Sequence, residues 1–374
     1  MALAAVEAEA LEEVAQAEAG NILMIRNIKY FIVTFIFSGA ISISHAQELK
    51  IIFAGDIMGH DSQIASATTK EGYNYDTCFS FIKPYISSAD IAIANLEVTL
   101  AGPPYKGYPQ FSSPDELVES AKKAGFDLFI TANNHSLDRR QQGLERTIKI
   151  LDEKNIIHTG TFNDSYSRAK TYPLIIEKKS IRLALLNYTY GTNGLKVQAP
   201  NVVNYIDTAI IRLDLTKAKL AEPDFTIVTI HWGLEYQRKE NEKQIQLAKF
   251  ILDHGADAII GSHPHVIQPI KMYSYDEKEK LVVYSLGNFI SNQRKRYTNG
   301  GILFEMTLKK GEETQISDHD YLPIWVYKPK NKAGKAHFVL IPSNRDKKYY
   351  DSIGMSPENY TIMKQFQDDT AGHL

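Results

Sequence analysis

The sequence predicts an α/β domain with additional strands toward its C-terminal end. Short apolar runs of strand type alternate with helical segments, and polar side chains follow directly after many of these runs. This alternation favours βαβ units and a sheet that is buried on both faces. From about Ile267 onward the pattern changes to strands separated by charged turns, so we expect strand-rich additions on a central α/β layer.

Five apolar runs define the predicted central strands. They are Leu49–Ala54, Ile91–Ala94, Leu128–Thr131, Thr226–Ile230 and Ala258–Ile260. Three helices are predicted among them: Asp115–Ala124, Gln141–Glu153 and Asn241–His254. The first begins after a Ser-Ser-Pro sequence and is followed by Gly125, while the other two place apolar residues at helical spacing.

The rest of the chain predicts antiparallel strands and a polar end. Tyr172–Tyr188 has the pattern of a hairpin that turns near Lys178–Ser180. Four later runs are typical of strands, namely Lys280–Ser285, Ile302–Leu308, Tyr321–Tyr327 and His337–Ile341. We expect one continuous domain over residues 47–343 and a loosely packed polar tail over residues 344–374.

Composition excludes several classes of protein. The 374 residues are 44% hydrophobic and 23% charged, with a formal net charge of −2, which is ordinary for a globular protein. This balance gives no indication of nucleic-acid binding or of a membrane-surface patch. Cys78 is the only cysteine, so a disulfide within the chain and a cysteine-rich metal site are both excluded.

Residues 24–46 have the pattern of a secretory signal peptide. Arg26 and Lys29 precede the apolar run Tyr30–Ile41, and Ser44 and Ala46 are small residues at the −3 and −1 positions of a cleavage site before Gln47. The run is short for a transmembrane anchor, so we expect export to the periplasm, the cell envelope or the exterior of a bacterium. Residues 1–23 are interpreted as a mis-called start or a cloning remnant.

The polar clusters after the five central strands are the candidate site. In an open α/β sheet the carboxyl ends of parallel strands share one edge, where ligands bind. The residues expected there are Asp56, Glu97, Asn134, His135, His231, His263 and His265. Carboxylates, an amide oxygen and imidazoles form a ligand set for two divalent ions such as Mn, Zn or Fe.

Each of these residues also has an ordinary structural interpretation. Asp56 could cap a turn, Glu97 could be a solvated charge, Asn134 could hold a left-handed turn, and His231 could be a packed histidine. The sequence His263-Pro264-His265 is harder to explain in this way, because the proline fixes the turn and directs both imidazoles toward one point. Taken together, the clusters favour a metal site.

Six motifs in order carry a family resemblance. They are Gly55-Asp56-Ile57-Met58, Asn95-Leu96-Glu97, Ala132-Asn133-Asn134-His135-Ser136-Leu137-Asp138, His231-Trp232-Gly233-Leu234-Glu235-Tyr236, Gly261-Ser262-His263-Pro264-His265-Val266 and Tyr284-Ser285-Leu286-Gly287-Asn288-Phe289. Together they resemble the CapA/PgsA family of poly-γ-glutamate capsule synthesis proteins, which is related to the calcineurin-like metallophosphoesterases. The resemblance spans about residues 50–305.

The resemblance implies a metallophosphoesterase-like four-layer α/β/β/α sandwich that holds two metal ions. Asp56 and His265 would bind the first ion and Glu97 would bridge the two. Asn134, His231 and His263 would bind the second ion. His135 would act as general acid or as a donor to the transition state, oriented by Asp138.

The sequence departs from the wider phosphoesterase pattern at the first metal. That pattern has Asp-x-His, but here Met58 stands at the histidine position and His60 is the nearest histidine. Glu97 stands where the wider superfamily has an aspartate. These changes put the affinity of the first metal in doubt, and His60 is kept as a candidate ligand.

Basic residues after two of the motifs could bind substrate. Arg238 follows the His231 motif, and Arg294 follows the motif that contains Asn288; these three are the candidate substrate-binding residues. A solvated basic loop is the ordinary interpretation of the arginines. The functional interpretation is an anionic substrate, either a phosphoester or a polymer such as polyglutamate or an acidic glycan. The segment Pro103–Tyr108, which is rich in aromatic residues and glycine, could cover the site.

Three functions remain open at this point. The first is an exported metal-dependent hydrolase that acts on a phosphoester or related bond in an envelope polymer. The second is a non-catalytic accessory protein that binds or exports a capsule polymer together with capsule-synthesis membrane proteins. The third is a metal-dependent amide hydrolase. The sequence does not predict an oligomeric state.

Overall fold

Two β-sheets lie face to face in the described part of the chain. The computed structural model describes residues 47–374 except 276–277, 331–333 and 335, and Gln47–Leu374 form one compact unit. The predicted signal peptide (24–46) and the segment 1–23 lie outside the described residues. Within the described residues, no helix combines the length and the apolar character needed to cross a bilayer.

The first sheet contains three of the predicted central strands. Its order is β18 (Val339–Pro342), β17 (Thr314–Tyr327), β16 (Gly300–Lys310), β1 (Glu48–Ile57), β4 (Ile91–Leu96), β5 (Leu128–Ile130) and β6 (Ile157–Thr159), with β15 (Asn288–Ile290) paired to the end of β1. Pairing is parallel from β1 to β6 and antiparallel from β1 through β16 and β17 to β18. Three of the expected later strands, observed as β16, β17 and β18, therefore extend this sheet on one side, whereas the predicted strand Lys280–Ser285 lies in the second sheet.

The second sheet contains the other two predicted central strands. Its order is β13 (Ile270–Tyr275), β14 (Lys278–Val283), β12 (Ala258–Ser262), β11 (Phe225–His231), β9 (Ile181–Thr189) and β8 (Leu174–Lys178). The predicted hairpin is confirmed as β8 and β9. The expectation that all five polar clusters share the edge of a single sheet is wrong, because β11 and β12 lie in a sheet separate from β1, β4 and β5.

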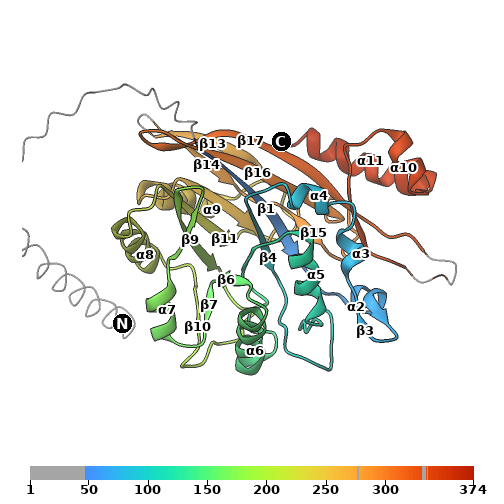
Figure 1. The fold of residues 1–374 in the computed structure, drawn as a ribbon, viewed down its shortest axis with the longest axis horizontal. Helices are drawn as coiled ribbons and strands as arrows, with labels where there is room; N and C mark the ends of the chain where they lie inside the picture. Colours follow the sequence, from blue (N-terminus) through green and yellow to red (C-terminus); the bar gives the residue numbers. More distant parts are fainter. Residues whose placement is uncertain (1–46, 276–277, 331–333, 335) are drawn as a thin grey trace, which may run out of the picture. The chain divides into compact units, whose positions relative to one another are not determined.

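Three apolar layers separate the sheets and helices, which confirms the four-layer sandwich (Figure 1). An inner core lies between the sheets and includes Phe53 and Ile93 of the first sheet and Ile227 and Ile260 of the second. The outer face of the first sheet packs against α3 (Asp76–Phe79), α4 (Lys83–Ile86) and α5 (Glu116–Ala124). The outer face of the second sheet packs against α8 (Thr208–Leu220) and α9 (Glu242–Asp253).

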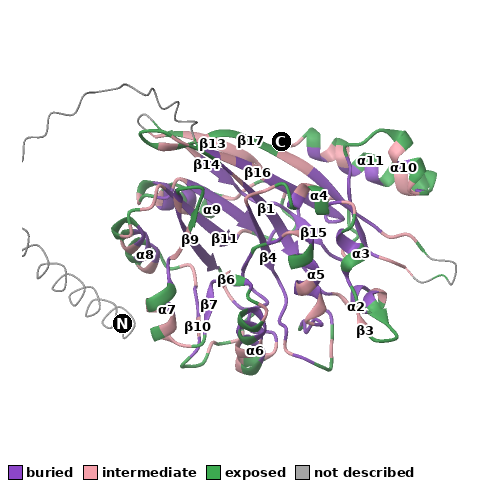
Figure 2. Ribbon diagram, viewed as in Figure 1, coloured by how far each residue is buried: buried purple, intermediate pink, exposed green. Residues whose placement is uncertain are grey.

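The alternation of side chains along each strand explains these layers. Ile51, Phe53 and the residues in phase with them face the inner core, while Ile52 and Ala54 face the helices. Both sets are apolar, as expected for strands that are buried on both faces. Figure 2 shows that buried positions gather on the central strands and exposed positions on outer helices such as α8.

Further helices and short strands complete this part of the fold. They are α2 (Asp61–Ala67), β2 (Thr68–Thr69), β3 (Gly72–Tyr73), α6 (Arg140–Glu153), β7 (Thr161–Phe162), α7 (Ser165–Thr171) and β10 (Val202–Val203). The three predicted helices are observed as α5, α6 and α9. A capping box between Asn241 and Gln244 starts α9, and Gly125, with φ of 117°, ends α5.

The C-terminal segment is the main difference from the predicted fold. Residues 344–374 were expected to be a loosely packed tail, but they contain α10 (Lys347–Ser352) and α11 (Pro357–Ala371). Tyr350, Met363 and Phe366 are buried in the inner core beside Trp325 of β17. These few apolar side chains anchor a polar segment because they cover strand residues that would otherwise face water.

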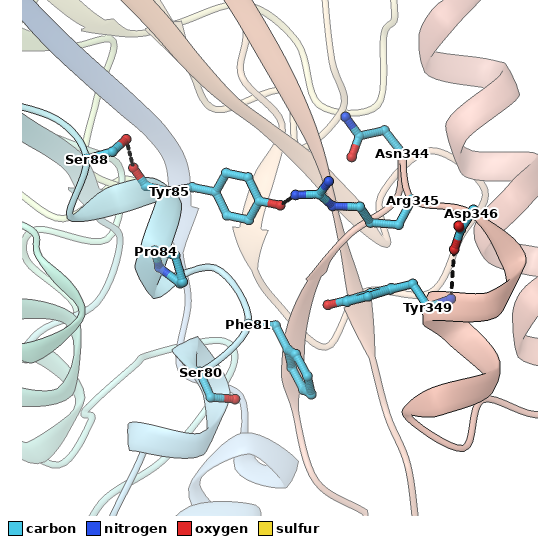
Figure 3. Close-up of a pocket in the computed structure, with 9 residues that line it drawn as sticks. All are labelled: Ser80, Phe81, Pro84, Tyr85, Ser88, Asn344, Arg345, Asp346 and Tyr349. Carbon is cyan, nitrogen blue, oxygen red and sulfur yellow. Dashed lines mark hydrogen bonds between the residues drawn. The ribbon is translucent and has the colours of Figure 1, made fainter.

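The start of this segment also forms one wall of a cavity (Figure 3). The cavity has a volume of about 840 Å³ and is lined by Ser80, Phe81, Pro84, Tyr85, Ser88, Asn344, Arg345, Asp346 and Tyr349. The guanidinium of Arg345 donates to the hydroxyl of Tyr85 across it. None of these residues belongs to the polar clusters at the strand ends, so the cavity is separate from the candidate site.

Replacing Phe366 by alanine tests the packing of α11. The buried ring lies against Gly300 of β16, so its loss should lower the free energy of unfolding by about 3–5 kcal/mol in urea denaturation. The control is Ile362→Ala on the same helix. That side chain is 40% exposed, and its loss should change stability by less than about 1 kcal/mol. Equal effects would show that α11 does not pack on the sheet.

Candidate metal centre

The ends of strands from both sheets meet at the candidate site. Asp56 lies near the end of β1, Glu97 follows β4, and Asn134 and His135 follow β5. On the second sheet, His231 is the last residue of β11, and His263 and His265 follow β12. All seven are buried. The predicted cluster is therefore assembled across the junction of two sheets.

A backbone irregularity places Asp56. The register of β1 against β4 shifts between Ala54 and Asp56, and its pairing with β15 shifts between Asp56 and Ile57. A Cβ at Gly55 would lie 1.9 Å from the carbonyl oxygen of Gly287, so only glycine allows this approach. Bulges of this kind often re-aim a side chain beside an active site.

Asp56, Glu97 and His265 form the tightest group. One ligand atom from each lies within 4.8 Å of the other two. Nδ1 of His265 is 3.1 Å from Oδ2 of Asp56 and 3.1 Å from Oδ1 of Asn288. The amide of Asn95 donates to Oδ1 of Asp56 at 2.8 Å, so both the carboxylate and the imidazole are held in place.

Both histidines of the His-Pro-His turn have left-handed backbones. The φ angles are 98° at His263 and 58° at His265. Such a conformation costs about 1–3 kcal/mol per residue and concentrates at functional sites. The turn brings the two imidazoles to a ring separation of 6.1 Å.

His231 and Asn134 lie on the other side of Glu97. Nε2 of His231 is 2.9 Å from Oδ1 of Asn134 and 3.6 Å from Oε1 of Glu97. Its Nδ1 is 2.9 Å from the hydroxyl of Ser262, which fixes the orientation of the ring. Burial, reinforced by His263 and His265, holds the pKa of His231 well below its usual value, so the ring is neutral, as a metal ligand must be.

His263 completes this side of the site. Its ring centroid lies 4.8 Å from that of His231 and 4.5 Å from that of Tyr190. Burial lowers the pKa of His263 to about 3. Its Nδ1 is buried and has no hydrogen-bond partner among the described residues. The free nitrogen is available to bind an ion.

The surroundings of Glu97 show whether the site fits a metal ion. Both of its carboxylate oxygens are buried and lack a hydrogen-bond partner among the described residues. Burial and the neighbouring charge of Asp56 raise its pKa well above the usual value. Nε2 atoms of His231, His265 and His135 lie 3.6, 4.0 and 4.0 Å from Oε1. A divalent cation would satisfy this unpaired carboxylate, so the residues present fit the metal that their chemistry implies.

His135 and Asp138 form a hydrogen-bonded pair beside the carboxylate. Nδ1 of His135 is 2.7 Å from Oδ2 of Asp138, which also accepts from the backbone N–H of Phe111 at 2.7 Å. Burial raises the pKa of Asp138, and the adjacent His135 opposes this rise. With Nδ1 held by Asp138, the Nε2 atom of His135 faces the site.

Two cavities adjoin the cluster. One, of about 390 Å³, is lined by Tyr108, Pro109, Gln110, Asn134, His135, Asp138, Asn193, Leu195 and Glu235. The other, of about 530 Å³, is mostly apolar, and Tyr190 and Trp232 belong to its walls. The first cavity opens onto His135 and includes Tyr108, the last residue of the segment that was expected to cover the site.

His60 and Met58 lie to the side of the cluster. Nδ1 of His60 accepts from the backbone N–H of Asn292 at 3.2 Å, and its ring packs against Phe111. His60 is not part of the tight acidic group formed by Asp56, Glu97 and His265. Met58 is buried in the apolar layer on the outer side of the first sheet.

The three predicted substrate-binding residues have structural partners. Arg238 donates to the carbonyl of Asp369 at 2.6 Å, and Arg294 donates to the carbonyl of Val326 at 3.2 Å. Asn288 is fully buried and contacts His265. The structure therefore gives Asn288 a role in positioning His265, and it directs both arginines to backbone carbonyls.

Several residues that shape the site had no predicted role. Asn95 links Asp56 to His231, with its amide nitrogen 3.3 Å from Nδ1 of that imidazole. Ser262 and Tyr190 orient and cover the histidines of the second sheet. Asn95 and Ser262 each lie inside a motif of the sequence, next to or near a candidate ligand. Their positions inside these motifs could have indicated them, but the sequence does not show which neighbours their side chains contact.

Comparison with known proteins identifies a family, curated relatives and solved structures that are similar to this chain. The family described as "Bacterial capsule synthesis protein PGA_cap" matches residues 50–293. The Bacillus anthracis capsule biosynthesis protein CapA is 29% identical over 276 residues, covering 70% of this chain and 64% of that protein. The Bacillus subtilis PGA biosynthesis protein CapA is 30% identical over 294 residues, covering 75% of this chain and 74% of that protein. Haemophilus influenzae NAD nucleotidase has a TM-score of 0.48 at 12% identity, covering 87% of this chain and 67% of that one.

The family match covers the part of the chain that carries the site. The match spans a little under two thirds of the length of the Bacillus anthracis relative. The family match extends over more than half of this chain and includes all seven residues at the strand ends. We conclude that the chain belongs to the family of bacterial capsule synthesis proteins.

Proposed function

We propose that the protein is an exported metal-dependent hydrolase of the metallophosphoesterase type, which acts on an anionic polymer of the capsule or cell envelope. The observation that carries this proposal is the buried, unpaired carboxylate of Glu97, which lies among imidazoles and faces His135. Membership of the capsule synthesis family supports the class of substrate. The predicted signal peptide supports export.

Two divalent ions fit the arrangement of donors. Asp56 and His265 would hold one ion, with Asn134, His231 and His263 holding the other and Glu97 between them. Bound ions would lower the pKa of a water molecule and polarise a phosphoryl oxygen. Asn95 and Asn288 contribute by fixing the Asp56 carboxylate and the His265 ring.

His135 is the candidate general acid. Asp138 holds its Nδ1, so Nε2 is the atom that would give a proton to the leaving oxygen. The cavity of about 390 Å³ next to His135 offers space for the leaving group. Asp138 in turn is fixed by the N–H of Phe111, so the proton donor is held by two successive hydrogen bonds.

A non-catalytic accessory role is the second candidate. The observation in its favour is Met58, which supplies no imidazole to the first metal and is buried in an apolar layer. In that case the protein would bind or help to export a capsule polymer beside membrane proteins of capsule synthesis. A metal-dependent amide hydrolase is a third candidate, because a metal-activated water can also attack a carbonyl group.

Metal content is the first prediction for this site. Purified protein should contain about two divalent ions per chain by plasma mass spectrometry. The double variant His231→Ala/His263→Ala should lose metal, while His319→Ala, at an exposed position on β17, should retain it. One ion per chain would indicate that the Asp56–His265 side is weak. No metal after incubation with Mn or Zn would rule out the hydrolase.

Hydrolysis of a simple phosphoester is the second prediction. Asp56→Ala should abolish phosphate release from p-nitrophenyl phosphate because it removes a metal ligand. His135→Gln should lower kcat by roughly 10²–10⁴ with metal content unchanged. Asp138→Asn should lower kcat by roughly 10–100 through loss of the His135 orientation. Full activity in His135→Gln would contradict its role as the acid.

Assays on polymers separate the three candidate functions. Release of glutamate from poly-γ-glutamate, without release of phosphate from esters, would identify an amide hydrolase. Polymer binding that survives metal removal, without hydrolysis of any substrate, would support the accessory role.

A further inference from the structure

Two loops bring aromatic and basic side chains toward the metal centre. The loop after β11 contains Tyr236 and Arg238, and the loop after β15 contains Lys295, Arg296 and Tyr297. The ring of Tyr236 lies 6.2 Å from that of His265, and its backbone N–H donates to the carbonyl of Pro264 at 2.8 Å. The φ angle of Tyr236 is 66°, which is unusual for a large side chain. The surrounding contacts therefore hold Tyr236 in a costly conformation next to the candidate ligands.

Helix α11 holds both loops in place. The guanidinium of Arg296 forms a two-point ion pair with Asp369, at 3.0 and 2.7 Å. Arg238 donates to the carbonyl of the same residue at 2.6 Å. The ring of Tyr297 contacts both guanidiniums, at 4.3 and 4.9 Å from its centroid. The two arginines are thus engaged with the end of α11.

Lys295 is left as a free cation at this position. Its ammonium lies 5.0 Å from the centroid of the Tyr236 ring. Among the described residues this ammonium has no hydrogen bond or ion pair, and the side chain is exposed. Outward from the metal centre, the side chains follow one another in space as His265, Tyr236 and Lys295. An anion at Lys295 would therefore be separated by the Tyr236 ring from a group bound at the Asp56–His265 side of the site.

A carboxylate next to Tyr236, that of Glu235, carries a charge opposite to that of Lys295. Glu235 is exposed and belongs to the wall of the cavity next to His135. A polyanion is repelled by this carboxylate and attracted by Lys295. The two charges therefore favour one direction for the polymer, with its next anionic group on the Lys295 side and the leaving group on the His135 side.

We propose that Lys295 and Tyr236 form an anion subsite that binds a carboxylate or phosphate of the polymer next to the group at the metal centre. This inference rests on the proposed function for its substrate, although binding at the subsite does not require turnover. The Lys295 ammonium is the donor to the anion, and the Tyr236 ring, whose hydroxyl interacts with the Glu235 carboxylate, holds the ammonium in place. Tyr236 lies inside the residues 50–293 matched by the family, and Lys295 lies two residues beyond them.

Equilibrium binding tests the subsite independently of catalysis. Isothermal titration would use two probes, an oligo-γ-glutamate and a short poly(glycerol phosphate), which separate a carboxylate from a phosphate polymer. Lys295→Gln should weaken binding of the preferred probe about tenfold, because a hydrogen bond to a charged group is lost. The control Lys309→Gln changes an exposed lysine on β16 and should have no effect.

A kinetic comparison tests the same subsite during turnover. Lys295→Gln should raise KM for a substrate with a neighbouring anion and leave kcat unchanged. Its KM for p-nitrophenyl phosphate, which has no second anion, should not change, and its metal content should equal that of the parent protein. An equal rise in KM for both substrates would show that Lys295 acts on the metal centre and not on a neighbouring anion.

The outcomes separate the subsite from the proposed hydrolase. Lys295-dependent binding without any hydrolysis would support the subsite and overturn the hydrolase. Hydrolysis with unchanged binding in Lys295→Gln would overturn the subsite and leave the hydrolase in place. Failure of the parent protein to bind either polyanion would also overturn the subsite.

Discussion

The burial of one carboxylate without a hydrogen-bond partner constrains the rest of the structure. Removing a charged group from water is expensive unless it is paired, and Glu97 has no hydrogen-bond partner among the described residues. Three imidazoles, one at the end of β11 and the others in the segments after β5 and β12, surround it at 3.6–4.0 Å, and Asp56 is close by. Much of the local backbone serves this arrangement, including the irregularity at Gly55 and the left-handed histidines of the His-Pro-His turn.

The sequence predicted the elements of the fold better than their assembly. The central strands and the three helices were found because apolar periodicity and caps are local signals. The division into two sheets was not predicted, because the apolar pattern of a strand such as Thr226–Ile230 would be the same in either sheet. The packing of α11 was missed because only a few side chains, such as Met363 and Phe366, hold a largely polar segment to the strands.

The candidate site shows the same contrast between residue type and direction. Asp56, Glu97 and His263 were predicted because polar residues directly after buried strands are conspicuous. The substrate-binding roles of Asn288 and Arg238 stay predictions, and their contacts within the protein were not predicted, since a side chain that binds substrate and one that supports a neighbour have the same sequence signature. Asn288 contacts His265, and Arg238 contacts the end of α11, which are pairings between distant parts of the chain.

The origin of the site in two sheets has a consequence for substitutions far from it. Glu97 and Asp56 belong to the first sheet and His231 and His265 to the second, so the spacing of the donors depends on how the sheets pack. That packing is set by inner-core side chains such as Phe53 and Ile260. A change in the volume of one of these side chains can therefore alter the separation of carboxylate and imidazole without touching either. Substitutions in the hydrocarbon layer between the sheets belong among those that tune the chemistry, alongside those at the ligands.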